Sequence, residues 1–284
     1  MRLTQAWNRS YAPATFREVW GDVGAFTTLR LARRFDRLEK EDDTHDFNSW
    51  ALFAPNAHLA RLNHDLAAAG VPPIDADWFW STLLALGGKL MSHDSCTYDG
   101  DLLVRISATN DWITLATRPA TVETACLKGI LQTYERPSPR TKNLQYETLL
   151  GFMQDSDRER EEVILADSAG LLRETCSANL IAVDQQGDWV TPSDNCLPGL
   201  TLRLFADFLG SERAIRQRLI RIDQMHEFAA LWCCGTGRLI CAISEIPEIS
   251  WRAHDPSAEN MRAHALQHQF RTFLFKHEDC LVVS

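Results

Sequence analysis

The strongest constraint on how this chain folds is a proline-containing break at residues 135–141. Its sequence is Glu135-Arg136-Pro137-Ser138-Pro139-Arg140-Thr141. A helix cannot run through two prolines separated by one serine, because each ring removes a backbone N–H and clashes with the preceding turn. Segments of strand and helix character lie on both sides. The sequence therefore predicts an α/β protein of two lobes, 1–134 and 142–284, joined by a linker at 135–141, with a site between the lobes.

Hydrophobic periodicity and turn residues predict the elements of each lobe. In the first lobe we expect a strand at 25–31, a helix at 57–69, a buried helix within 78–88, and two strands at 102–107 and 112–117. In the second lobe we expect a helix at 143–154, strands at 162–167, from 171 onward, at 180–183 and at 189–192, a helix at 199–209 and a strand at 239–243.

Charge and hydropathy exclude two classes of partner. The formal net charge of −9 and the isoelectric point near 5.5 argue against a broad nucleic-acid surface, which needs clustered excess lysine and arginine. The longest apolar stretch, residues 78–88, is too short to cross a bilayer. The first nine residues lack the apolar core of a signal peptide. We therefore expect a cytoplasmic protein with no nucleic-acid and no membrane partner.

The cysteines and histidines do not form a metal-binding pattern. Eight cysteines are scattered along the chain, without a C-x-x-C pair or a Cys/His grouping of zinc-site spacing. We expect free, mostly buried thiols in a reducing compartment. The histidines at positions 58, 64 and 93 are not spaced as ligands with any carboxylate, so no metal site is predicted.

Lys142 and Glu174 are of the residue types that hold an aldehyde cofactor with a protonated ring. A lysine amine must be unprotonated to react, and Arg140 and the dipole of a helix starting at residue 143 would both lower its pKa. Glu174 lies in an otherwise apolar strand, where a carboxylate needs a partner such as a protonated pyridine nitrogen. Each has a plainer explanation: a solvent-exposed lysine at a helix start, and a carboxylate paired with Arg173 or another surface cation.

Two glycine-threonine turns downstream suit a phosphate group. Pro198-Gly199-Leu200-Thr201 opens a predicted helix, whose backbone N–H groups and dipole favour an anion, and Thr201 adds a hydroxyl. Gly235-Thr236-Gly237 precedes a predicted strand and offers a second turn. Arg61, on the helix predicted at 57–69, would add a bidentate cation. Taken singly, these are ordinary turns and a solvated helix arginine. Together with the lysine and the glutamate, they are far more specific.

This order of motifs resembles the class IV (fold type IV) pyridoxal 5′-phosphate enzymes, which include branched-chain and D-amino acid aminotransferases and aminodeoxychorismate lyase. The resemblance extends from Gly21-Asp22 to about Ile246. It implies a two-lobed α/β fold like that of D-amino acid aminotransferase, pyridoxal 5′-phosphate as the cofactor, and a homodimer. It also implies these roles: Lys142 as the Schiff-base lysine, Glu174 as the partner of the ring nitrogen, and Arg61, Leu200, Thr201 and Thr236 as phosphate ligands.

The same resemblance implies a substrate pocket lined by the strand that carries Phe26, Thr28 and Arg30. It also suggests that Tyr146 donates to the phenolic oxygen of the cofactor ring. Three features depart from the family pattern, and the first is Gly21-Asp22-Val23-Gly24, which carries one extra residue against the usual Gly-Asp-Gly.

Residues 33–48 have the character of an insertion. Ala108 stands where D-amino acid enzymes carry an arginine that binds the substrate carboxylate, and Arg105 or Arg30 is the expected substitute.

Three functions remain open at this stage. The first is transfer of an amino group between an amino acid and a 2-oxo acid. The second is release of pyruvate from 4-amino-4-deoxychorismate, in the folate and 4-aminobenzoate pathway, suggested by Phe26-Thr27-Thr28 and by the Lys-x-Leu-Gln spacing after Lys142. The third is a non-catalytic binding protein on the same fold. Both enzymes would use the same lysine, glutamate and phosphate ligands, so these residues do not distinguish a transaminase from a lyase.

Overall fold

The computed structural model describes residues 3–35, 48–92, 100–120 and 126–283, so His93 and most of the expected insertion lie outside the described residues. The chain divides into two compact units, one formed by residues 1–120 with 274–284 and the other by residues 121–273. The break at 135–141, where the sequence predicted the division, is a loop inside the second unit.

Strand pairing explains where the division falls. Strand β7 (Leu127–Thr133), which precedes that loop, pairs with strands of the second unit on both of its edges. Strand β17 (Cys280–Val283), at the C-terminal end, pairs with β4 (Asn48–Phe53) of the first unit. Backbone hydrogen bonds between distant segments, rather than the proline signal, therefore decide where the chain is partitioned.

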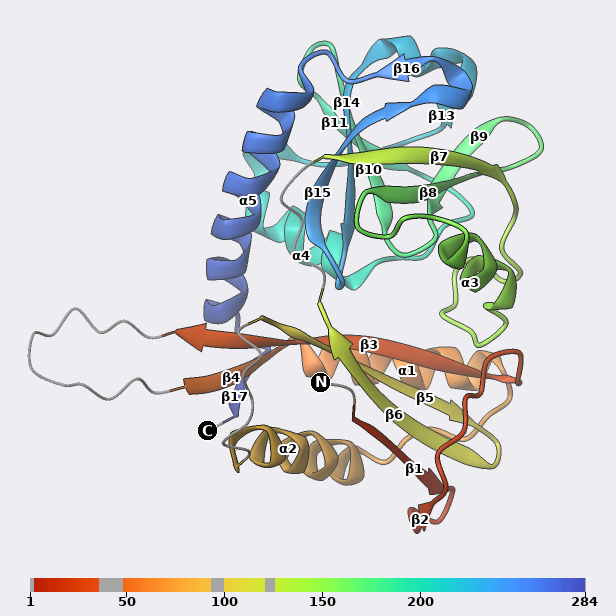
Figure 1. The fold of residues 1–284 in the computed structure, drawn as a ribbon, viewed down its shortest axis with the longest axis vertical. Coiled ribbons are helices and arrows are strands. Elements are labelled where there is room, and N and C mark those ends of the chain that lie inside the picture. The colour runs from red at the N-terminus through yellow and green to blue at the C-terminus, as the bar shows by residue number, and fades with distance from the viewer. Residues whose placement is uncertain (1–2, 36–47, 93–99, 121–125, 284) are drawn as a thin grey trace, which may run out of the picture. The chain divides into compact units, whose positions relative to one another are not determined.

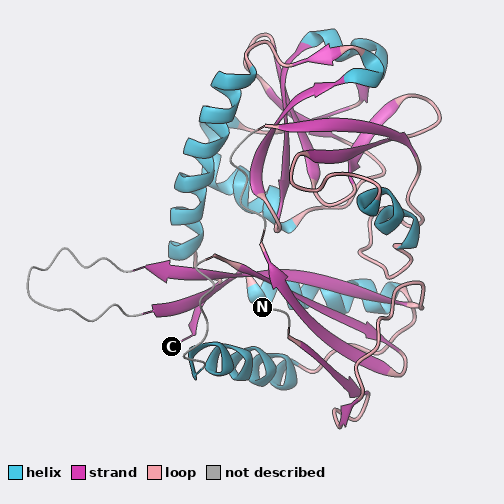
Figure 2. Ribbon diagram, in the orientation of Figure 1, coloured by secondary structure: helices cyan, strands magenta, loops and turns pink. Residues whose placement is uncertain are grey.

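The first unit is built on a seven-stranded antiparallel sheet in the order β17-β4-β3-β5-β6-β1-β2 (Figures 1 and 2). Its remaining elements are β1 (Thr4–Asn8), β2 (Pro13–Ala14), β3 (Gly24–Phe35), α1 (Pro55–Ala68), α2 (Ala76–Ser92), β5 (Leu102–Thr109) and β6 (Trp112–Pro119). The predicted helix at 57–69 and the strands at 25–31, 102–107 and 112–117 are confirmed.

The helices of this unit pack by the apolar faces expected from their sequences. Leu59, Leu62 and Leu66 of α1 join Phe79 and Leu83 of α2 in one buried cluster with the sheet. Helix α2 is amphipathic rather than buried on all sides, since Leu84 on its outer face is 49% exposed. Among the described helices, none combines the length and apolarity needed to cross a bilayer.

The second unit contains a ten-stranded mixed sheet, with the path β12-β11-β10-β14-β15-β7-β8-β9-β13 and β16 paired to β15. Strands β9 and β10 also pair with each other, which closes the stretch from β10 to β9 into a ring. The elements not yet given are α3 (Glu147–Gln154), β8 (Glu161–Ala166), β9 (Leu171–Thr175), β10 (Asn179–Asp184), β11 (Trp189–Pro192), α4 (Leu200–Leu209), β12 (Arg216–Arg218), β13 (Ile220–Arg221), β14 (Phe228–Gly235), β15 (Leu239–Ile246), β16 (Trp251–Arg252), α5 (Pro256–Lys276) and the 3-10 turns Ser211–Arg213, Ile222–Glu227 and Pro247–Ile249.

The predicted helix at 143–154 was wrong at its start. Helix α3 begins at Glu147, so Lys142 lies in the loop before it and the α3 dipole does not begin at this lysine. Within that loop, Thr141 N donates to Ser138 O at 3.0 Å. The other predicted elements of this unit are confirmed within a few residues.

Candidate active site

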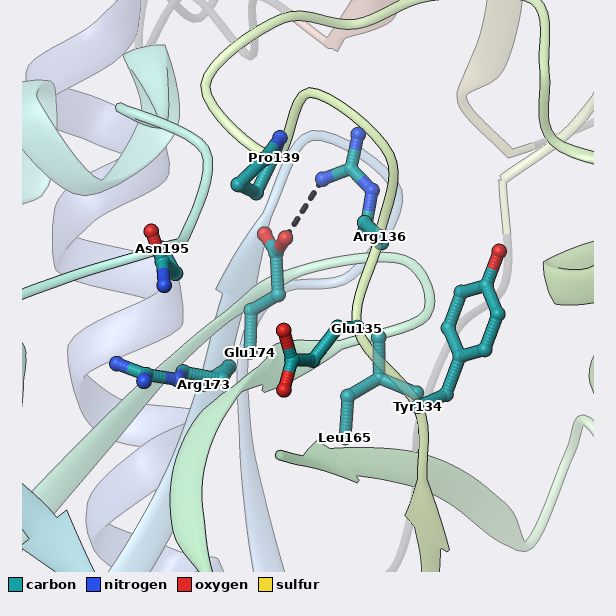
Figure 3. A pocket seen from close by; sticks show the side chains of 8 residues that line it. All are labelled: Tyr134, Glu135, Arg136, Pro139, Leu165, Arg173, Glu174 and Asn195. Atoms are coloured by element: carbon teal, nitrogen blue, oxygen red, sulfur yellow. Dashed lines mark hydrogen bonds and ion pairs between the residues drawn. The ribbon is translucent and has the colours of Figure 1, made fainter. Parts of the chain in front are cut away.

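Glu174 is held as an ion pair in the second unit. Its side chain is 5% exposed, and its Oε1 accepts a hydrogen bond from Nη1 of Arg136 at 2.6 Å (Figure 3). Its Oε2 accepts the backbone N–H of Leu197 at 3.2 Å. The alternative of a pair with Arg173 is wrong, because Arg173 bonds Asp167 at 2.5 Å instead. A carboxylate with both oxygens occupied keeps one orientation, as a partner for a ring nitrogen requires.

Arg136 is a site residue that the sequence reasoning missed. It lies in the proline-containing loop, which the sequence predicted to be a linker between the lobes. Its side chain is nevertheless only 8% exposed. Its Nη2 also donates to the carbonyl of Thr141 at 2.9 Å, next to Lys142. Burial alone would lower the pKa of this guanidinium, but the charge and hydrogen bond of Glu174, together with Tyr146 and Cys176, raise it overall. The signal that pointed to it was the apolar strand around Glu174, since a buried carboxylate demands a cation.

Tyr146, at the C-terminal end of the loop that carries Lys142, also contacts residues close to Glu174. The tyrosine is buried, its hydroxyl donates to the carbonyl of Cys176, and its ring centre lies 5.9 Å from the Arg136 guanidinium carbon. Burial raises the pKa of the phenol, so it acts as a hydrogen-bond donor near neutral pH. Both ends of segment 141–146 are thus bonded to groups around Glu174, with Lys142 between them.

The two threonines predicted to bind phosphate meet in the structure. Oγ1 of Thr201, in the first turn of α4, lies 3.1 Å from Oγ1 of Thr236, in the turn between β14 and β15. Helix α4 begins at Leu200 without a side-chain cap on its N-terminal N–H groups. Two hydroxyls beside an uncapped helix N-terminus form a donor set that suits an anion. We refer to Gly199–Thr201 together with Gly235–Thr236 as the threonine cradle.

Glycine is required on both sides of the threonine cradle. A Cβ at Gly199 would lie 1.8 Å from Oδ1 of Asn179, whose Nδ2 donates to the carbonyl of Leu197 at 2.7 Å. A Cβ at Gly235 would lie 2.9 Å from Cβ and 3.1 Å from Cα of Ala178. Residues 177–179, which form the end of the β9–β10 turn and the start of β10, therefore pack against both arms of the cradle. That segment directly follows β9, the strand that carries Glu174.

A cavity of about 260 Å³ borders the Arg136–Glu174 pair (Figure 3). It is lined by Tyr134, Glu135, Arg136, Pro139, Leu165, Arg173, Glu174 and Asn195. The Glu174 carboxylate therefore faces open space on this side. Within the described ranges, no group of three or more His, Cys, Asp or Glu side chains is placed to hold a metal ion.

Arg61 belongs to a polar cluster in the first unit. Its Nη2 donates to Oγ1 of Thr27 at 2.9 Å, and the same hydroxyl lies 2.8 Å from Nδ1 of His58. Helix α1 and strand β3 therefore orient this arginine together. The cluster lies on the face of the sheet that packs against α1.

The predicted substrate residues share the opposite face. Thr28 pairs with Arg105 in the β3–β5 register, so these side chains project to the same side, together with Phe26 and Arg30 at alternate positions. Ala108 projects to the other side and lies in the hydrophobic core. A carboxylate-binding side chain at position 108 would therefore be buried in the hydrophobic core.

The two candidate arginines on this face differ in availability. Arg30 is buried in an ion pair with Asp101 at 2.6 Å, each side chain 6% exposed. Arg105 is 19% exposed, pairs with the more exposed Glu18 at 2.6 Å, and lies 4.4 Å from the ring centre of Trp20. Arg105 is therefore the one that can exchange its partner for another carboxylate at lower cost.

The family model described as amino-transferase class IV matches residues 43–246, well over half of the chain. The match includes Arg61, Lys142, Glu174 and the threonine cradle, and begins after the strand that carries Phe26. No curated protein sequence matches the chain.

Solved structures share the fold over nearly the whole chain. A fold IV transaminase from Curtobacterium pusillum is 18% identical, with a TM-score of 0.70 and coverage of 93% of this chain and 99% of that one. A branched-chain amino acid aminotransferase from Thermobaculum terrenum is 14% identical, with a TM-score of 0.74 and coverage of 99% and 98%. An aminotransferase from Brucella abortus bound to PLP is 16% identical, with a TM-score of 0.67 and coverage of 94% and 98%. The predicted fold type is thereby confirmed.

Proposed function

This chain belongs to the class IV aminotransferase family, and on that premise we propose that it transfers an amino group between an amino acid and a 2-oxo acid, with pyridoxal 5′-phosphate attached to Lys142. The observation that carries the proposal is the convergence in the second unit of the Glu174 carboxylate, the threonine cradle and the loop of Lys142. Each is a donor or acceptor that a different part of this cofactor needs.

The residues present fit the cofactor by their chemistry. The Lys142 amine suits the aldehyde, and the oriented Glu174 carboxylate suits a protonated ring nitrogen. Tyr146 would serve the phenolic oxygen by turning its single O–H proton from the Cys176 carbonyl to that oxygen. Thr201, Thr236 and the N–H groups at Leu200 suit the phosphate. By family resemblance Arg61 is a further phosphate ligand. When bound, the cofactor supplies an electron sink for the substrate α-carbon.

The protein groups then have separate tasks. Once the substrate amine had replaced Lys142 on the aldehyde, the freed Lys142 amine would act as general base for the α-proton and return it as general acid. Glu174 stabilises the protonated ring nitrogen of the bound cofactor. Arg136 and the backbone N–H of Leu197 hold the Glu174 carboxylate in place. On the sheet face that carries Phe26, Thr28, Arg30 and Arg105, we assign the substrate carboxylate to Arg105. Arg30 is not assigned this role because it forms a buried ion pair with Asp101. The seven described cysteines are free, which supports the cytoplasm as the location. A homodimer remains part of the proposal.

The first test combines a spectrum with a covalent trap. Purified protein mixed with pyridoxal phosphate should develop a band in the yellow region, and borohydride should fix the adduct on the peptide that contains Lys142. Lys142→Ala should abolish the adduct, whereas Lys128→Ala, an exposed lysine on β7, should leave it unchanged. Absence of the band, or adducts spread over many lysines, would refute the proposed cofactor site.

The second test identifies the reaction. Transfer of an amino group to pyruvate or 2-oxoglutarate would establish a transaminase. Release of pyruvate from aminodeoxychorismate without an added 2-oxo acid would establish the lyase suggested by Phe26-Thr27-Thr28. Cofactor binding with neither reaction would indicate a binding protein on this fold.

A further inference from the structure

Arg238 is a buried arginine that the proposed chemistry does not use. It ends the turn Thr236–Arg238 between β14 and β15, and its side chain is 8% exposed. Its Nε donates to Oε2 of Glu162 at 3.1 Å, and its Nη2 donates to the carbonyl of Arg158 at 2.5 Å. Its own carbonyl accepts Nε2 of Gln267 on α5 at 2.7 Å. The turn that presents Thr236 is thus anchored at its far end by groups from β8 and α5.

Glu162 connects this turn to the other wall of the threonine cradle. Its side chain is 5% exposed and lies on β8. While Oε2 accepts from Arg238, Oε1 accepts the hydroxyl of Ser177 at 2.9 Å. Ser177 precedes Ala178, the residue against which Gly235 packs. One carboxylate therefore bridges the turn after β9 and the turn after β14.

The turn between β14 and β15 has a strained backbone and is closely packed. Leu239, which follows Arg238, has a φ of 59°, a left-handed conformation that a residue with a Cβ adopts only when its surroundings impose it. At the other end of the turn, Gly235 has no room for a Cβ. A turn that does not prefer its own conformation depends on its anchors, and Arg238 supplies the buried ones.

We propose that Arg238 and Glu162 are positioning residues, which hold the Thr236 hydroxyl beside Thr201 and thereby set the affinity of this site for a phosphate group. The inference rests on the proposed function, since it takes the threonine cradle as the cofactor phosphate site. It adds a role for two residues that touch neither the cofactor nor the substrate.

The electrostatics of the pair make each member dependent on the other. Burial raises the pKa of Glu162, against hydrogen bonds from Thr175 and Ser177 and the charge of Arg158, and burial lowers the pKa of Arg238. The two side chains meet as an ion pair at 3.1 Å. Removal of one member leaves the other buried group with its remaining hydrogen bonds but without its ion-pair partner. The turn is therefore expected to shift when either residue is replaced, and the double replacement is expected to cost less than the sum of the singles.

The test compares two ligands that differ only in the phosphate. Dissociation constants for pyridoxal phosphate and for pyridoxal are measured by absorbance on the wild-type chain, Arg238→Met and Glu162→Gln. Arg218→Met serves as the control, since Arg218 forms a half-exposed pair with Glu227 elsewhere in the same unit. We expect the first two variants to weaken pyridoxal phosphate about 10- to 100-fold, the worth of a charge-assisted hydrogen bond, and pyridoxal less than about twofold. The control should bind both ligands like the wild type.

Several outcomes would overturn the inference. Equal weakening of both ligands would mean a general loss of structure, and unchanged binding of pyridoxal phosphate would mean that the pair does not position the cradle. If Arg238→Met does not fold, Glu162→Gln, which is isosteric and still accepts from Ser177, is read by the same criterion. A wild-type chain that binds neither ligand would instead refute the proposed function.

Discussion

The Arg136–Glu174 pair allows a quantitative prediction for the variant Arg136→Met. The pair has an N···O distance of 2.6 Å and side chains 8% and 5% exposed. Two unit charges about 4 Å apart attract by roughly 4 kcal/mol at an effective dielectric constant of about 20. Removal of one partner from a buried pair typically costs about 3–5 kcal/mol, because the other charge is left without compensation. We therefore expect Arg136→Met to lower the free energy of unfolding by about 3–5 kcal/mol.

The assay is urea unfolding followed by circular dichroism, with linear extrapolation to water. Arg216→Met is the matched control, because Arg216 pairs with Asp188 at the surface, where the side chains are 60% and 54% exposed. An exposed pair contributes about 0–1 kcal/mol, so the control should change little. A loss for Arg136→Met no larger than that of the control would refute the reasoning.

A double-mutant cycle tests whether the cost comes from this pair. Glu174→Gln removes the charge that Arg136 compensates while keeping the size of the side chain. Arg136→Met combined with Glu174→Gln should therefore lose clearly less stability than the two single variants added together. Strict additivity would mean that the arginine stabilises the protein through its bond to the Thr141 carbonyl rather than through the carboxylate.

Three further predictions follow from contacts and burial. Gly235→Ala should cost about 1–3 kcal/mol and weaken pyridoxal phosphate binding, because its Cβ meets the Ala178 backbone, whereas Gly151→Ala, with open space at a helical position, should stabilise by about 0.5–1 kcal/mol; equal urea midpoints would contradict this. Burial raises the pKa of Cys176 to about 12, so at pH 8 only about one thiol in 10⁴ is ionised. Iodoacetamide should therefore label Cys176 only in urea, as measured by mass spectrometry. Labelling of the folded protein as fast as glutathione would contradict the burial of this thiol. Arg105→Gln should raise KM for the amino acid about 10- to 100-fold with kcat nearly unchanged, and an unaltered KM would remove Arg105 from the substrate site.

The sequence was sufficient for features that depend on neighbours along the chain. The apolar spacing of Leu59, Leu62 and Leu66 predicts α1 because a 3.6-residue period places them on one face. The Pro-Gly start of α4 at residues 198–201 is a local signal as well, and the structure puts the helix N-terminus there. Where a local signal was stretched over a loop, as in the helix expected from residue 143, the prediction failed.

Pairing between distant segments was beyond the sequence. Arg136 and Glu174 lie 38 residues apart, and Glu162 and Arg238 lie 76 apart. Nothing in the local pattern ranks Arg136 above Arg173 as the partner of Glu174, since both are cations within reach of the same strand. The choice follows from the fold: Arg173 and Glu174 are consecutive residues of β9, so their side chains project to opposite faces, and the proline-containing loop brings Arg136 to the Glu174 side.

The sequence by itself determined the chemical types that the site contains, because a lysine, a glutamate and two glycine-threonine turns are recognisable from order and local conformation alone. Only the tertiary structure decided that the two threonine hydroxyls meet at 3.1 Å, that Arg30 is bound to Asp101 while Arg105 is more exposed, and that the chain divides after residue 120. The physical reason is that local conformation depends on residues a few positions apart, whereas strand register and buried ion pairs depend on which distant segments exclude water together.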